Sequence, residues 1–129
     1  MEKVIRPHLI KPILDRVSYE RLSNPQNGVT VNIRPEDDID IRKVSEELVN
    51  VTMERKVIVS PESIMKLSVR MMIEIPIDSI EFGKLEDPKA YIMASQPVRV
   101  LIGYVSNMVS NLTVNSNIGP IVTPPVIAE

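Results

Sequence analysis

Few side chains in this sequence are of a type that performs chemistry. The chain has one histidine, His8, and no cysteine, so a Ser-His-Asp triad is not supported and thiolate nucleophiles and cysteine-ligated zinc are excluded. The serines lack the context of a nucleophile elbow, and neither a dinucleotide-binding fingerprint nor a phosphate loop is present. This composition favours binding or assembly over catalysis, with no cofactor and no metal.

One cluster of carboxylates, Glu36, Asp37, Asp38 and Asp40, superficially resembles a cation-binding loop. It lacks the alternating ligands, central glycine and closing glutamate of a calcium hand. We interpret segment 36–40 as a solvated connection, with an acidic docking site for a partner as the alternative. An enzyme would need an unrecognised carboxylate site such as Asp37 with Asp40. We rank this interpretation third, after the binding protein and the assembly subunit described below.

The overall composition is that of a globular protein. The 129 residues are 43% hydrophobic and 25% charged, with a formal charge of −2, which gives no bias toward nucleic acid. We expect a single domain over residues 1–129. No apolar run is long enough for a signal peptide or a membrane span, so we expect a cytoplasmic protein without membrane insertion.

The first part of the chain predicts strands, because apolar side chains recur with a period of two. The clearest cases are residues 49–59 and 65–76, which we expect to form an antiparallel hairpin around the turn 60–63. Arg55 interrupts the apolar face of the first of these, which we interpret as a bulge or an edge. Residues 29–33 and 13–22 complete four strands, about 13–76, in an antiparallel sheet with one solvated side.

The period then changes to that of a helix over about 97–113. The apolar residues on one stripe are Val98, Leu101, Ile102, Val105, Met108, Val109 and Leu112. A shorter helical turn is expected from Asp87-Pro88 to Met93. The tail 118–129 carries three prolines and is expected to be extended. The fold class is therefore α+β, with a four-stranded antiparallel sheet and one long C-terminal helix packed on it.

The other face of the long helix consists of small or uncharged residues, among them Gly103, Ser106, Asn107 and Ser110. Between Ala90 and Ala128 only Arg99 is charged, although a solvated helix normally carries Lys and Glu. We therefore predict self-association through these four residues, as a dimer or a tetramer. The alternative is an exposed face that lacks charge without a partner.

The apolar residues at the end of the helix and in the tail have two interpretations. The tail folds back on the sheet or helix, or it lines an apolar groove that accepts extended polypeptide. In the second case the client-binding residues are Met108, Leu112, Ile118, Ile121 and Val122.

One family resemblance rests on the C-terminal third. Tyr104-Val-Ser-Asn-Met-Val-Ser-Asn-Leu-Thr113, followed by Ile118-Gly-Pro-Ile-Val-Thr-Pro-Pro125, resembles the end of SecB-type protein-export chaperones. There, a long helix leads through a Gly-rich turn into a proline-containing extended segment. The sequence departs from that family in having no second C-terminal helix, and in carrying Val98, Ile121 and Val122 where aromatic residues are typical.

The resemblance implies a SecB-like fold that assembles as a homotetramer, a dimer of dimers with the long helices at the interface. It also implies an ATP-independent holdase for unfolded or extended polypeptide, with the SecA motor as a further partner. A shortened relative that serves one labile antitoxin is equally compatible. The alternative function, from another class, is a structural self-assembly subunit of a phage or an appendage, without client binding.

Overall fold

A computed structural model of the chain describes residues 4–9, 11–24, 28, 30–61, 64–116 and 118–127. Its elements are β1 (Ile13–Arg21), β2 (Asn32–Ser45), β3 (Leu48–Ser60), β4 (Met65–Pro76), α1 (Ser79–Gly83), α2 (Pro88–Met93) and α3 (Gln96–Thr113). Outside the described residues lie Val29 of the predicted strand 29–33, Glu62 and Ser63 of the predicted turn, and the last two residues of the predicted tail. β2 overlaps that predicted strand at Asn32 and Ile33 and continues to Ser45.

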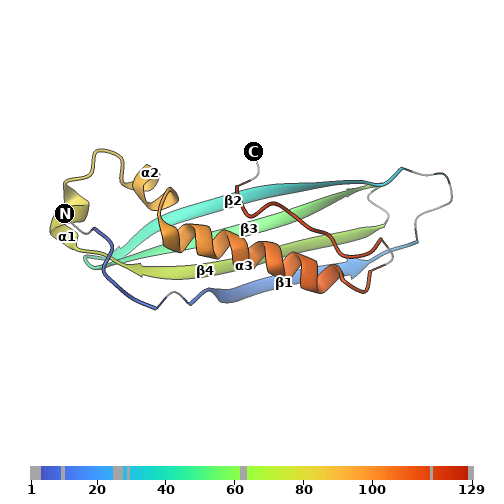
Figure 1. Cartoon of the computed structure of the whole chain (residues 1–129), viewed down its shortest axis with the longest axis horizontal. Coiled ribbons are helices and arrows are strands. Elements are labelled where there is room, and N and C mark those ends of the chain that lie inside the picture. Colours follow the sequence, from blue (N-terminus) through green and yellow to red (C-terminus); the bar gives the residue numbers. More distant parts are fainter. Residues whose placement is uncertain are drawn as a thin grey trace.

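The four strands form one antiparallel sheet in the order β1-β4-β3-β2. The hairpin expected between residues 49–59 and 65–76 is present, with Val57 opposite Leu67 and Val51 opposite Ile73. β1 and β2 are consecutive in the chain but lie on opposite edges (Figure 1). The two most apolar strands are therefore in the centre, where both of their edges are paired.

α3 packs on one face of this sheet, over β4 and β3, and the tail runs back beside it on the same face (Figure 1). The odd-numbered residues of β3 and β4 point into this layer and are buried from Val49 to Val59 and from Met65 to Ile75. They meet the apolar stripe of α3, including Val98, Leu101 and Val105. The predicted fold class is confirmed: a four-stranded antiparallel sheet carries a long C-terminal helix.

The short helices begin at aspartates. The Asp78 carboxylate accepts hydrogen bonds from the backbone N–H groups of Ile80 and Glu81, and that of Asp87 accepts one from Ala90. These bonds satisfy N–H groups that have no partner inside a helix. The helix expected after Asp87 is α2, whereas α1 was not predicted. No helix of the described residues is long and apolar enough to cross a membrane.

The prediction that segment 36–40 is a solvated connection is wrong, because these residues lie in the middle of β2. Glu36, Asp38 and Asp40 point to solvent, while Asp37, Ile39 and Ile41 are turned toward the core side. The alternation of Ile39 and Ile41 with Asp38 and Asp40 was the available signal for a strand. β2 is an edge strand. Its charged side chains and Pro35 discourage pairing of this edge with another chain.

Candidate functional site

The centre of the molecule holds a buried ion pair between β3 and β2. Arg55 donates from Nε to Asp37 Oδ1 and from Nη2 to Asp37 Oδ2, each at 2.7 Å, and both side chains are 0% exposed. Because the two residues are opposite each other in the β2–β3 register, the sheet itself aligns the guanidinium with the carboxylate. A bidentate pair of this kind satisfies charge and directional hydrogen bonding together.

The expectation of a bulge or an edge at Arg55 is wrong. β3 is a central strand whose pairing with β2 and β4 is regular around this residue. Arg55 occupies a core-facing position of the alternation, between buried Met53 and Val57. The long side chain therefore crosses the core layer, and its charge is balanced by Asp37 rather than by solvent.

The rest of the guanidinium binds the C-terminal tail and α3. Nη1 donates to Ser106 Oγ, Thr123 Oγ1 and the carbonyl oxygen of Pro124, and Nη2 donates to that of Val126, all at 2.8 Å. Arg55 thus connects the sheet, through β3, to both α3 and the tail.

α3 binds the same tail with its hydroxyl side chains. Ser106 Oγ donates to the carbonyl oxygen of Pro124 at 2.9 Å, and Ser110 Oγ donates to that of Ile121 at 3.0 Å. The N–H of Ile121 donates to Thr113 Oγ1 at 2.7 Å. We call Arg55, Ser106, Ser110 and Thr113 the tail-binding site, because each of them bonds a backbone atom of the tail.

The five residues predicted to bind clients are distributed over three environments. Met108, Leu112 and Ile118 are half-buried against the core. Ile121 is 3% exposed and belongs to the core itself, whereas Val122 is 83% exposed. Of the two interpretations of the tail, folding back on the helix and sheet is the one observed.

The four residues predicted to self-associate also separate into two pairs. Ser106 and Ser110 point at the chain's own tail and bond its carbonyl groups, so their hydroxyls are already engaged within the chain. Gly103 is half-buried and Asn107 is exposed. They lie on the outward side of α3 near Tyr104, which is 51% exposed.

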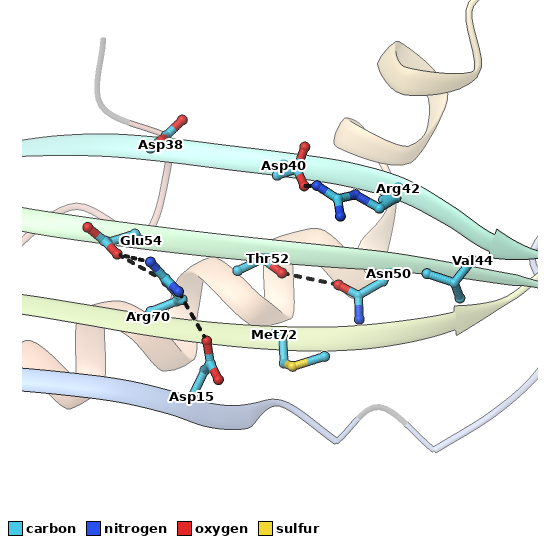
Figure 2. A pocket seen from close by; sticks show the side chains of 10 residues that line it. All are labelled: Asp15, Asp38, Asp40, Arg42, Val44, Asn50, Thr52, Glu54, Arg70 and Met72. Carbon is cyan, nitrogen blue, oxygen red and sulfur yellow. Dashed lines mark hydrogen bonds and ion pairs between the residues drawn. The ribbon is translucent and has the colours of Figure 1, made fainter.

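The opposite face of the sheet carries a shallow polar pocket of about 480 Å³ (Figure 2). At one side of it Glu54 accepts hydrogen bonds from Arg70 and Arg16, and Arg70 also pairs with Asp15 at 3.5 Å. Thr52 donates to Asn50 Oδ1 within the same pocket. Among the described residues no group of three or more His, Cys, Asp or Glu side chains is placed to hold a metal ion.

The Glu54 carboxylate is held in its charged form by this arrangement. Partial burial raises its pKa, but the hydrogen bonds and charges of Arg70 and Arg16 outweigh burial and lower the pKa below its ordinary value of 4.5. A group whose pKa is lower in the folded protein stabilises the fold above its unfolded pKa, and this contribution disappears as the pH falls through the folded value.

We therefore expect Glu54→Gln to lower the free energy of unfolding by no more than about 1 kcal/mol near neutral pH, since the pair is close to the surface. The difference from wild type should shrink as the pH falls below about 4.5, because the unfolded wild-type chain takes up a proton at this carboxylate before the folded protein, whose pKa is lower, does so. Urea unfolding of both proteins at a series of pH values measures this difference in the free energy of unfolding. A difference that stays constant down to about pH 3 would contradict the assignment.

The tail-binding site was not predicted from the sequence. Arg55 and Asp37 each stand as a single charge at a core-facing position of an alternating pattern, in two strands that pair. Two opposite charges at core-facing positions of two alternating segments indicate a buried ion pair. The alternation around Asp37, however, was not recognised as a strand.

Comparisons with known proteins support the fold and leave the family open. No protein-family model matches the sequence, and no curated protein matches it. The structure of this chain is similar to a solved structure, that of the Mycobacterium tuberculosis SecB-like chaperone Rv1957 in complex with a ChAD peptide from the HigA1 antitoxin Rv1956. The TM-score is 0.71 at 13% identity, over 93% of this chain and 88% of that one. The chain therefore has the fold of SecB-like chaperones.

Proposed function

We propose that this protein is a chaperone that binds extended segments of unfolded polypeptide and performs no catalysis. The observation that carries the proposal is the SecB-like fold over 93% of the chain, whose solved example holds a peptide. Binding would proceed without nucleotide, since the sequence has no phosphate loop. An antitoxin segment, as in that example, and exported proteins handed to the SecA motor are the two client classes to test, both in the cytoplasm.

The apolar surface that we assign to clients lies at the C-terminal end of α3. It consists of Met108, Leu112 and Ile118, which are half-buried, and Val122, which is almost fully exposed. Burying such side chains against a client contributes about 25 cal/mol per Å² of apolar area. Ile121 is excluded while the tail is docked, because it is part of the core.

Self-association through the outward face of α3 belongs to the same proposal. Gly103 and Asn107, with Tyr104 between them, leave this face free of charge over most of its length. A small residue allows a second helix to approach closely, and a twofold pair of such helices is the simplest closed assembly. Two such pairs would give the tetramer.

A structural assembly subunit is the second candidate, and the same uncharged face of α3 favours it. In that case the face would be buried permanently against neighbouring subunits and no client would bind. The two candidates differ in whether the purified oligomer recognises unfolded polypeptide.

The test is suppression of aggregation. A chemically unfolded model protein is diluted into increasing concentrations of this protein without nucleotide, and light scattering reports both turbidity and the mass of the soluble complex. We expect saturable suppression by a species of defined stoichiometry. A stable oligomer without any suppression would overturn the chaperone proposal and leave the assembly subunit.

A further inference from the structure

The tail is held through its backbone and not through a strand ladder. Four of its backbone atoms are bonded by side chains of the tail-binding site: the N–H and carbonyl of Ile121 and the carbonyls of Pro124 and Val126. The tail is not a strand of the sheet. Its attachment is therefore side chain to main chain along most of its described length.

Recognition of main-chain atoms depends little on the sequence of the segment that is bound. Any extended segment carries carbonyl groups, and among the described tail residues the N–H that the site binds is that of Ile121, so prolines at Pro120, Pro124 and Pro125 are tolerated. Two side chains of the segment, Ile121 and Thr123, are fully buried and Ile127 is partly buried, while Val122 points to solvent. These are the properties of a site for extended polypeptide in general.

The buried guanidinium of Arg55 favours a tail-binding site that is occupied by a polypeptide segment over one that is empty. If the tail departs, Arg55 keeps Asp37 and Ser106 but loses Thr123 and the carbonyls of Pro124 and Val126. Loss of these three acceptors by a charged donor is unfavourable, although the pair with Asp37 remains. A second extended segment offers carbonyl groups of the same kind, so replacing the tail restores the bonds that an empty site would lose.

We propose that the tail-binding site is a client site that residues 120–127 of the same chain occupy, so that a client segment binds by displacing the tail. The proposal rests on the proposed chaperone function and adds a second client site beside the apolar surface of Met108 and Leu112, with its regulation; Val122 then leaves with the tail. The preferred client segment is extended, with a branched apolar residue in the place of Ile121 and a small residue in the place of Thr123. The tail thereby acts as an internal competitor.

A disulfide lock tests displacement directly, because the chain has no cysteine of its own. Ser106 Oγ and Thr123 Oγ1 are 3.4 Å apart, so two sulfur atoms in their places must approach each other by about 1.3 Å to reach the length of an S–S bond. The double variant Ser106→Cys with Thr123→Cys, oxidised with oxidised glutathione, should hold the tail in place. Its affinity for a fluorescently labelled, chemically unfolded protein should fall about tenfold or more and return on reduction with dithiothreitol.

The controls are the wild type and Ser106→Cys alone, which cannot form the internal disulfide and should not respond to the oxidant. Loss of free thiols without added glutathione and without a cross-link between chains, read by mass spectrometry of the denatured double variant, verifies the lock. Unchanged affinity of the verified locked form would overturn the displacement proposal while leaving the chaperone function in place. Absence of binding by the wild type and by the reduced variant would instead overturn the chaperone function.

A second variant addresses the same point without a disulfide. Ile121→Ser weakens the tail as a competitor, so the full-length variant should bind the unfolded protein more tightly than wild type, by about tenfold. Ile80→Ser, the same change at an exposed position in α1, should leave the affinity unchanged. A peptide with the sequence of residues 118–127 should compete with the client. Equal or weaker binding by Ile121→Ser would count against displacement.

Discussion

Replacing Arg55 by methionine is expected to lower the free energy of unfolding by about 3 to 5 kcal/mol. The substitution keeps much of the length and apolar volume of the side chain but removes its charge and every hydrogen bond that the guanidinium donates. Asp37 is then a fully buried carboxylate without its cation. The carbonyls of Pro124 and Val126 also lose the hydrogen bonds from Arg55, and Pro124 keeps the one from Ser106 Oγ, so the tail should detach more readily.

Urea unfolding measures the loss, and the surface offers a matched control. Arg16 also pairs with a carboxylate, Glu54, at 3.0 Å, but its side chain is exposed, so Arg16→Met should cost less than about 1 kcal/mol. The double variant Arg55→Met with Asp37→Leu removes both charges and should regain part of the loss. Equal costs for Arg55→Met and Arg16→Met would show that the buried pair does not hold the layers together.

Gly103→Leu is expected to dissociate the proposed oligomer without harming the subunit. A β-carbon at Gly103 meets no atom of its own chain within 4 Å, and leucine favours a helix over glycine by about 0.5 to 1 kcal/mol. The larger side chain therefore has room in the subunit and none against a closely packed second helix. Overpacking there costs about 1 to 3 kcal/mol, and each 1.4 kcal/mol raises the dissociation constant about tenfold.

Sedimentation or light scattering gives the mass, and thermal unfolding shows that the subunit remains folded. Gly103→Ala, with a single added methyl group, should shift the mass less than Gly103→Leu. An unchanged oligomer in Gly103→Leu would exclude this face of α3 from the interface and direct attention to the exposed edges of the sheet.

The local elements followed from periodicity, which neighbouring residues encode by themselves. Residues 65–76 alternate strictly and form β4, and the apolar stripe from Val98 to Leu112 forms α3 within one residue of the predicted start. Segment 36–40 was misinterpreted because charge outweighed the alternation of Ile39 and Ile41. The face of β2 that points away from the core is exposed to solvent, so acidic side chains on it are compatible with a strand.

The position of each element in the sheet and the role of Arg55 were decided only by the tertiary structure. The order β1-β4-β3-β2 separates strands that follow one another in the chain, and Arg55 meets Pro124 across 69 residues of sequence. Ser106 and Ser110 illustrate the difference: their small size and polarity were evident from the sequence, but whether they contact a second subunit or the tail was not. Periodicity is a property of neighbouring residues, whereas these contacts depend on which distant segments the folded core brings together.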